Sequence, residues 1–541
     1  MRKITINAVN NLVFEFDYNP DIISEIKCNF DRRRWNPDTK KWWAPATASN
    51  IRHAQNLAVT WGFEFKSSEE NVETEETVKS EETVEKYSTE ELVAQNPTSM
   101  PHQLEAIGFL ISHAKCILAD DMGLGKTHNL IRASICVGAE QIVIIAPACV
   151  KTTWRREIER WDPDFKQITI YSGKTKKSHI EIEGVGDKRE YLILNYDIAG
   201  AHLTDIKRAD TAILDESQYV KNQQALRTKS IAQWLKSINP SRIWLATGTP
   251  VMNRPIELVS PLSMILNFKR EFGSYFSFGK KYCNAYEKHI GYGNTVWDFS
   301  GTSNLGELHQ RLSHVMIRRT RKEALGDAIR KNSPVTIPVN GFTPAAIEVD
   351  DDDVNSFRHR QRHVMKKRVE AGEAKIDHAI AWIKNYQEVQ PDNSLVVFCH
   401  HISVAQALAV KFNIEAYTGE TSQDERDKLV SDFQSGETKL FIATTLSAGV
   451  GITLTKSSDV LFTEYEFRPS DHWQAEDRLA RIGQDNIVQP YYLHLENSID
   501  NAMAKLIEKK SHIIHSITDG VDVSELDNEV NDIDFLWGEI S

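Results

Sequence analysis

Short apolar runs alternate with helical patterns twice along this chain, and this alternation restricts its fold more than any other feature. Between about residues 96 and 335 the runs are KCILAD, QIVIIAP, YLILN, TAILDE and RIWLATG, and after about residue 375 they are SLVVFCH, KLFIATT, DVLFTEY and IVQPYYLHL. Each run is brief, rich in β-branched residues and bounded by polar residues, Gly or Pro, as buried strands are. Strands that alternate with helices form parallel sheets covered on both faces. The sequence therefore predicts an α/β protein with two lobes.

The expected segment boundaries follow from changes in composition. Apolar alternation in LVFEF and a turn at Asn36-Pro37-Asp38 predict a small α+β module at the start of the chain. Two acidic segments each carry a net charge of −8 and are expected to be solvated. The expected segments are the module 1–66, an acidic linker 67–95, a first lobe with a helical insertion 96–335, a helical connector 336–374, a second lobe 375–516 and an acidic tail 517–541.

The segment ADDMGLGKT at 119–127 follows the strand KCIL and precedes a helix, which is the context that a phosphate-binding loop requires. Gly123 and Gly125 let backbone N–H groups approach phosphate oxygens. Lys126 can reach the β and γ phosphates, and the hydroxyl of Thr127 can hold Mg²⁺. The strict pattern GxxxxGK[ST] has Gly where Asp120 stands, so a Gly-rich turn is the alternative until a partner motif is found.

The partner motif is TAILDESQ at 211–218, a second apolar strand that ends in two acids. Asp215 then lies at the carboxyl edge of the sheet, where it can bind Mg²⁺, and Glu216 can deprotonate the water that attacks the γ phosphate. An Asp-Glu pair alone is usually a solvated strand end. Because it follows the phosphate loop at the end of another buried strand, nucleoside triphosphate hydrolysis becomes the working hypothesis.

Five motifs in this order resemble those of superfamily-two helicase-like ATPases, and among these the Swi/Snf-type DNA translocases. They are ADDMGLGKT, DESQ, LATGTP at 245–250, TTLSAGVGITLT at 444–455 and QAEDRLARIGQ at 474–484. The family's own loop reads DEMGLGKT, so Asp120 fits it. The resemblance covers about residues 98 to 515. It implies two tandem RecA-like lobes with parallel sheets, ATP and Mg²⁺ as ligands between them, and DNA as the partner.

The same resemblance implies roles for individual residues. Gln103 matches the glutamine that contacts adenine, and Arg478 and Arg481 match arginines that reach the γ phosphate across the cleft. The expected catalytic residues are Lys126, Asp215, Glu216, Arg478 and Arg481. The expected ATP-binding residues are Gln103, Asp120, Asp121, Met122, Gly123, Leu124, Gly125, Lys126, Thr127 and Gly451, with Thr127 and Asp215 as Mg²⁺ ligands. The residues expected to couple the ATP site to the second lobe are Gln218, where many relatives carry His, Thr247, Gly248, Thr249 and Gln474.

Family DNA contacts map onto segments of both lobes, since Gly, Thr and backbone amides near turns hold phosphates without reading bases. Lys151 and Arg155 can instead belong to a solvated helix face, and Trp154 and Trp161 have the spacing of a packing pair. The mapped segments are 147–161, 193–197, the TGTP turn and 444–451. The named candidates are Lys151, Asn195, Tyr196, Thr444 and Thr445.

The N-terminal segment FEFDYNPDIISEIKCNFDRRRWNPDTKKWWAPA resembles the HepA-related (HARP) domain, which precedes the motor in annealing helicases that remodel stalled forks. Arg33 and Lys41 are expected to bind phosphates there, with the neighbouring tryptophans meeting exposed bases at a junction. The alternative, which is compatible with the first, is that these tryptophans form the core of a tiny domain.

The motifs together predict a DNA-stimulated ATP hydrolase that translocates on double-stranded or forked DNA and remodels or re-anneals it, as in repair of replication forks. A remodeller that displaces DNA-bound protein and an ATP-gated DNA clamp that does not step are the alternatives. The tail is expected to be solvating, or else to dock on a partner, such as a single-strand-binding or repair protein, or to compete with DNA.

The net charge of −12 argues against a nucleic-acid ligand when it is taken as one number. Since the linker and the tail each carry −8, the remaining residues carry +4. No apolar run approaches the roughly 18–20 residues of a membrane helix, and the start MRKITINAVNN has no secretory pattern. We expect a cytoplasmic protein of bacterial or viral origin, or a nuclear one in a eukaryote, with no membrane partner.

Overall fold

The computed structural model describes the chain outside a set of short gaps. The described residues are 2–6, 11–19, 22–23, 26, 30, 33–36, 39–46, 50, 53–54, 57–58, 61, 63–66, 89–173, 175, 178–291, 294–326, 331–343, 357–448, 451–481, 483–520 and 532–540. The chain divides into two compact units, and the first contains the N-terminal module. None of the helices within the described ranges is long and apolar enough to cross a membrane.

The N-terminal module is a five-stranded sheet in the order β3-β4-β2-β1-β5. Leu12 and Phe14 alternate with partly exposed residues along β2, which places them in the core, as the alternation predicts. Ile26 and Leu57, both in helical turns, belong to the same core. The strands are β1 Lys3–Ile6, β2 Asn11–Glu15, β3 Arg34–Asn36, β4 Lys41–Pro45 and β5 Glu64–Lys66.

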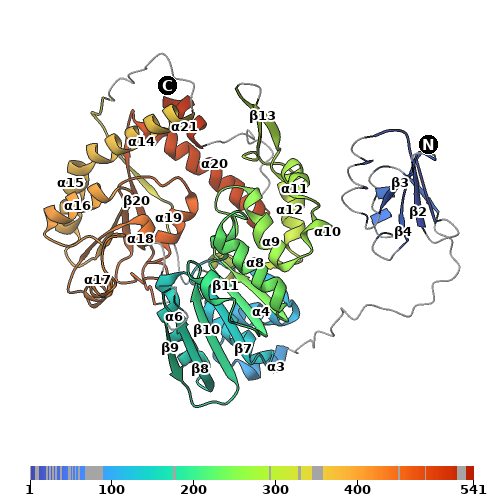
Figure 1. The fold of residues 1–541 in the computed structure, drawn as a ribbon. Helices are drawn as coiled ribbons and strands as arrows, with labels where there is room; N and C mark the ends of the chain where they lie inside the picture. The colour runs from blue at the N-terminus through green and yellow to red at the C-terminus, as the bar shows by residue number, and fades with distance from the viewer. Residues whose placement is uncertain are drawn as a thin grey trace. The chain divides into compact units, whose positions relative to one another are not determined.

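Lobe 1 is built on an eight-stranded sheet in the order β15-β6-β12-β11-β7-β10-β8-β9, parallel except for β9 (Figure 1). Its five predicted strands form, because their side chains are buried on both faces. The strands are β6 Lys115–Leu118, β7 Gln141–Ala146, β8 Phe165–Tyr171, β9 His179–Glu183, β10 Arg189–Asn195, β11 Thr211–Asp215, β12 Arg242–Ala246 and β15 Met316–Ile317. The helices are α3 Thr89–Gln95, α4 Pro101–Ser112, α5 Lys126–Cys136, η1 Ala148–Val150, α6 Lys151–Trp161, α7 Ala199–His202, η2 Ser217–Val220 and α8 Leu226–Ile238.

A mostly helical insertion separates β12 from β15, as expected. It contains η3 Pro255–Leu258, α9 Val259–Ile265, α10 Phe268–Glu271, α11 Tyr275–Tyr282, the hairpin β13 Tyr286–Gly291 and β14 Asn294–Asp298, and α12 Leu305–Leu312. After the insertion the chain returns to lobe 1, where β15 pairs with β6, the strand that leads into the phosphate loop. The helix α13 Arg321–Leu325 follows at once, so the end of the insertion lies beside that loop.

Lobe 2 contains a five-stranded parallel sheet in the order β16-β20-β19-β17-β18. All four predicted strands are present. The strands are β16 Val335–Val339, β17 Leu395–Cys399, β18 Leu440–Thr444, β19 Asp459–Phe462 and β20 Gln489–Leu495. The helices are α14 Phe357–Ala374, α15 Ile376–Val389, α16 Ile402–Phe412, α17 Gln423–Ser435, α18 Thr445–Ala448, α19 Pro469–Glu476, α20 Ile499–Asp519 and α21 Asp532–Ile540.

The boundary expected at residue 375 is wrong. Strand β16 pairs with β20 and so belongs to the sheet of lobe 2, although its sequence lies in the expected connector. Val364 and Ala371 of α14 are buried in the core of the same lobe. The connector is therefore part of lobe 2, and its acidic stretch lies outside the described residues.

The C-terminal helix α21 also belongs to lobe 2 rather than to a solvated tail. Leu536 is fully buried, and it packs with Ile533 into the core of the lobe. The acids of the helix pair with neighbouring cations: Asp532 with Lys510 at 2.7 Å, and Asp534 with both Lys288 and Arg360 at about 3 Å. Residues 521–531, and residues 67–88 of the acidic linker, lie outside the described residues.

Candidate active site

The phosphate loop joins β6 to α5 and adopts the backbone conformation that its glycines allow. Gly123 and Gly125 have φ values of +84° and +82°, which side chains rarely tolerate. A Cβ at Gly125 would also collide with the amide of Gln103. The ammonium group of Lys126 donates hydrogen bonds to the carbonyls of Asp120 (2.7 Å) and Asp121 (3.2 Å), so it lies over the loop. Burial lowers the pKa of Lys126.

Asp120, which breaks the strict phosphate-loop pattern, is completely buried and forms an ion pair with Arg319. Nε of Arg319 donates to Oδ1 of Asp120 at 3.0 Å, and Nη2 binds the other oxygen, so the pair is bidentate. Such a fork is the strongest geometry for an arginine and a carboxylate. The acid at this position is thus part of the structure of the loop.

Two further arginines bind the next two residues of the loop. Arg318 pairs with Asp121 at 3.1 Å and continues to Asp519 at the end of α20. Arg321 donates two hydrogen bonds to the carbonyl of Met122, at 2.9 Å and 2.6 Å. None of these three arginines is predicted to contact the loop by the sequence motifs. In the sequence they stand out only because they lie close together, directly after the apolar pair of β15.

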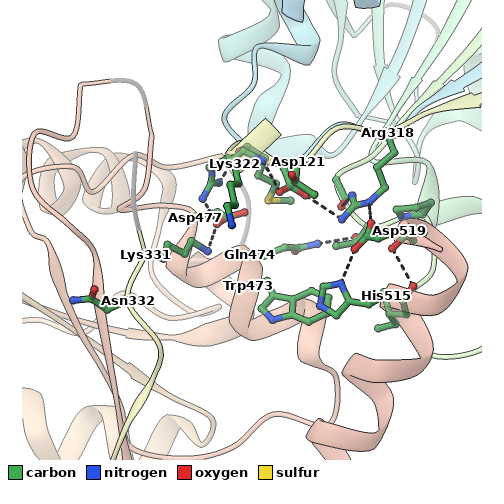
Figure 2. Close-up of a pocket in the computed structure, with 18 of the residues that line it drawn as sticks. Asp121, Arg318, Lys322, Lys331, Asn332, Trp473, Gln474, Asp477, His515 and Asp519 are labelled. Carbon is green, nitrogen blue, oxygen red and sulfur yellow. Dashed lines mark hydrogen bonds and ion pairs between the residues drawn. The ribbon is translucent and has the colours of Figure 1, made fainter. Parts of the chain in front are cut away.

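A cavity of about 510 Å³ opens beside the loop, between lobe 1 and lobe 2 (Figure 2). Asp121 and Arg318 line it from lobe 1, and Asp477 lines it from lobe 2. Asp477 pairs with Arg321 at 2.8 Å and with Lys331. Burial alone would raise the pKa of Asp477, but the charges of Arg321 and Lys331 outweigh burial and lower it to about 2. The pair between Arg321 of lobe 1 and Asp477 of lobe 2 joins the lobes beside the loop.

Asp215 ends β11, and Glu216 follows with a left-handed backbone at φ +51°. Both carboxylate oxygens of Asp215 accept hydrogen bonds, Oδ1 from the backbone N–H of Glu216 (3.0 Å) and Oδ2 from the indole N–H of Trp154 (2.7 Å). Burial and the neighbouring charge of Glu216 raise the pKa of Asp215 to about 6. Two adjacent acids of this kind fit a divalent cation, and the oxygens of Asp215 and Thr127 are ligands that Mg²⁺ accepts.

The expected coupling residues form one chain of hydrogen bonds from Glu216 to lobe 2. The amide of Gln218 donates to Glu216 at 2.8 Å and accepts from the hydroxyl of Thr247 at 2.7 Å. The hydroxyl of Thr247 accepts from the N–H of Thr249 at 2.9 Å, and the hydroxyl of Thr249 accepts from Gln474 at 3.2 Å. Gly248, between the two threonines, has no room for a Cβ, which would meet the side chain of Met122 at 2.7 Å.

Arg478 and Arg481 follow α19 and point from lobe 2 toward the site. Nη2 of Arg478 lies 4.0 Å from the sulfur of Met122, and Nη1 of Arg481 donates to Thr453 at 2.9 Å. Burial lowers the pKa of Arg478. Burial and the charge of Arg478 lower the pKa of Arg481 to about 9. Gly451 instead lies against Val150 at the start of α6, so the structure does not place it at the phosphate loop.

Two family models match the chain in sequence. The SNF2-related domain matches residues 48–340, more than half of the chain, and the helicase conserved C-terminal domain matches residues 374–483. The chain belongs to the SNF2-related family.

Individual relatives agree with this family. The human DNA annealing helicase and endonuclease ZRANB3 is 31% identical in an alignment of 454 residues that covers 78% of this chain and 40% of that protein. The SWI/SNF-related matrix-associated actin-dependent regulator of chromatin subfamily A-like protein 1 of Xenopus tropicalis is 30% identical in an alignment of 443 residues that covers 77% of this chain and 44% of that protein. The chain thus spans less than half the length of these relatives. The solved SWI2/SNF2 ATPase core of Sulfolobus solfataricus in complex with dsDNA is 20% identical, with a TM-score of 0.37 over 78% of this chain and 93% of that one.

The five residues of this SNF2-related chain that were expected to contact DNA through the lobes turn their polar groups inward. Lys151 donates to Asn195 at 3.1 Å, and the hydroxyl of Tyr196 donates to the carbonyl of Asp215 at 2.7 Å. Thr444 bonds to Ser447, Thr445 bonds to the carbonyl of Cys399, and all but Lys151 are buried. In this arrangement the four buried side chains form hydrogen bonds within the lobes, and their contact with DNA stays a prediction. Gly449 and Val450 lie outside the described residues.

The N-terminal candidates lie at the surface of their module. Arg33 is exposed and donates to a backbone carbonyl, and Lys41 pairs with Glu15 at 2.6 Å with both side chains partly exposed. Trp35 is 46% exposed and contacts Trp42, with ring centroids 5.5 Å apart. The exposed face of Trp35 is compatible with contact to bases, whereas Trp42 packs against the core of the module. Both alternatives for the tryptophans therefore stay open.

Proposed function

We propose that this chain hydrolyses ATP between its lobes and uses the energy to move along double-stranded or forked DNA, which it remodels or re-anneals. One observation carries the proposal: the hydrogen-bond chain from Glu216 through Gln218 to Gln474 of lobe 2. Glu216 is the base that deprotonates the attacking water, and a change in its position would be transmitted along these hydrogen bonds to lobe 2. Membership in the SNF2-related family, and relatives named as annealing helicases, agree with this function.

In this mechanism the two lobes supply different parts of one site. Lys126 and the loop N–H groups bind the phosphates, and Glu216 orients and deprotonates the attacking water. Arg478 and Arg481 from lobe 2 stabilise the charge that develops on the γ phosphate. Mg²⁺ held by Thr127 and Asp215 would neutralise charge on the β and γ phosphates. Because Arg478 and Arg481 belong to lobe 2, their contact with the phosphates depends on lobe closure, so each hydrolysis cycle opens and closes the cleft.

The test is the rate of ATP hydrolysis with no DNA and with single-stranded, duplex and forked DNA. We expect duplex or forked DNA to raise the rate above the level without DNA, and single strands to raise it less. Displacement of a triplex-forming strand from duplex, dependent on hydrolysis, then separates stepping from clamping. An intact DNA-stimulated ATPase with no displacement would identify an ATP-gated clamp. Stimulation only by a protein–DNA complex would identify a remodeller that displaces bound protein.

A further inference from the structure

Two aromatic side chains from separate segments of lobe 1 meet at Asp215. The indole N–H of Trp154 donates to its carboxylate, and the phenol of Tyr196 donates to its carbonyl, both at 2.7 Å. Both rings are 1% exposed. Together with the N–H of Glu216 on the second carboxylate oxygen, these bonds give every oxygen of Asp215 a donor that the fold holds in place.

Trp154 connects Asp215 to a helix that has one free face. Along α6, Trp154 and Ile158 are buried, four residues apart, and therefore share one face of the helix. Thr152, Thr153 and Arg156 are exposed on the other side. Hydroxyl and guanidinium groups on a helix surface can bind DNA phosphates. A ligand on this outer face would act on the same rigid helix that holds the indole against Asp215.

Tyr196 connects Asp215 to a second surface. Its ring stacks on that of Tyr219, with centroids 5.0 Å apart and planes at 11°. The guanidinium of Arg227 lies 5.6 Å from the centre of the Tyr219 ring. Arg227 and Tyr219 line a cavity of about 220 Å³ between the lobes. Arg227, which is partly exposed, is thus connected through the rings of Tyr219 and Tyr196 to the backbone carbonyl of Asp215.

Such donors have a measurable effect on a ligand of a metal ion. Partners that orient metal ligands typically change metal affinity or activity by about 10–100-fold when they are removed. A carboxylate held at both oxygens also cannot rotate independently of the helix and strand that hold it.

We infer that Trp154 and Tyr196 are positioning residues, through which contacts on the outer face of α6 and at Tyr219 set the place of Asp215. DNA bound to these surfaces would thereby organise the Mg²⁺-binding carboxylate. The part of this inference that concerns DNA rests on the proposed function. The part that concerns the arrangement around Asp215 is tested by nucleotide binding alone.

The experiment uses Trp154→Phe, which keeps an aromatic ring but removes the N–H. Trp161→Phe is the matched control, since its indole, on the same helix, donates to Glu157 at 2.6 Å instead. Binding of fluorescent mant-ADP is measured with and without Mg²⁺. We expect all proteins to bind alike without Mg²⁺, and Trp154→Phe to lose about tenfold of the tightening that Mg²⁺ brings. Trp161→Phe should behave as the unmodified chain.

The second readout is the ratio of ATPase rates with and without duplex DNA. Trp154→Phe should lower this ratio and kcat while KM for ATP stays nearly constant, because the loop still binds the phosphates. Tyr196→Phe removes only a hydroxyl, and should lower the ratio in the same direction even if Trp154→Phe folds poorly. Equal Mg²⁺ effects and equal ratios in both variants and the control would overturn the inference. Absence of DNA stimulation in the unmodified chain would instead reject the proposed function, and the mant-ADP result would still decide the role of Trp154.

Discussion

Arg319 forms a buried, bidentate ion pair with Asp120, although the two residues lie 199 positions apart in the sequence. Asp120 stands where the general phosphate-loop pattern has Gly. In this chain the ion pair gives the acid a structural role, because it holds the loop from the end of β15, beside the junction of the two lobes. The first glycine of the general pattern is thus replaced by a tertiary contact that fixes the loop from outside.

Replacing Asp120 by Gly should therefore destabilise the protein although it restores the general pattern. It leaves the guanidinium of Arg319 buried without its main partner, which costs about 3–5 kcal/mol. Asp121→Gly is the matched control and should cost less, since Arg318 keeps its pair with Asp519. Urea unfolding of both variants measures the difference. Equal losses in the two variants would contradict the role given to the pair.

Lys126→Ala and Glu216→Gln should each abolish ATP hydrolysis, but for different reasons. Without Lys126 the phosphates lose their cation, so binding of ATP falls as well. Glu216→Gln removes the base, which is worth about 10²–10⁴ in rate, and leaves ATP bound. Phosphate release and mant-ATP binding measure the two effects, with Lys229→Ala on the exposed side of α8 as the control. Normal turnover in either site variant would refute the assignment.

Local patterns predicted the strands and the glycine-containing loop between β6 and α5, because both are set by residues that are neighbours in the chain. The nine predicted strands form, since each is a short run buried on both faces. Strand β16 was missed because it is an edge strand with a Pro at 338, where a missing N–H is tolerated. The acids of helix α21 favour a segment that is solvated, docks on a partner or competes with DNA, whereas Leu536 is buried in the core of lobe 2.

Contacts between distant segments explain what the sequence did not reveal at the site. The pairing of Arg319 with Asp120, and of Trp154 with Asp215, depends on which strands become neighbours in the sheet. Trp154 has the spacing of a core residue, and it is one, but its N–H has a polar partner that no local pattern indicates. The family motifs pointed to Gln218, Thr247, Thr249 and Gln474 one by one. The hydrogen bonds that join these residues become visible only in the fold.

Gln218→His should preserve coupling between the lobes, whereas Gln218→Leu should break it. His can still donate to Glu216 and accept from Thr247, but Leu leaves the buried hydroxyl of Thr247 without its acceptor. A lost bond of this kind costs about 1–3 kcal/mol, so kcat with DNA should fall roughly tenfold or more with KM for ATP nearly unchanged. Gln224→Leu, at an exposed position in the turn after η2, is the control. Full DNA-stimulated turnover in Gln218→Leu would show that the hydrogen bonds from Glu216 to Gln474 do not take part in the mechanism.

Leu536→Ala should destabilise lobe 2 by about 2–5 kcal/mol, because it opens a cavity in a fully buried position. Glu539→Gln on the same helix should cost less than about 1 kcal/mol, since its pair with Lys505 is largely exposed. Thermal unfolding of both variants makes the comparison. A solvated tail would show no difference between them.

The stability of lobe 2 should fall as the pH is lowered from 6.5 toward 4, in part because of His472. Its Nε2 accepts a hydrogen bond from the N–H of Glu466 at 2.9 Å, so the ring is neutral in the folded state. Burial lowers the pKa of His472 from 6.5 to about 4, and the neighbouring charge of Glu466 only partly opposes this, while Arg368 and His400 add to it. As the pH falls, His472 is protonated in the unfolded chain before it is protonated in the folded one. The contribution of the neutral ring to the free energy of unfolding is therefore fully present above pH 6.5, and about 3 kcal/mol of it is lost between pH 6.5 and pH 4.

The variant His472→Gln keeps an acceptor but cannot be protonated, so the urea midpoint of its unfolding should vary less over this pH range. His314→Gln, at an exposed position, is the control and should follow the unmodified chain. Parallel curves for all three proteins would show that His472 does not contribute to the pH dependence.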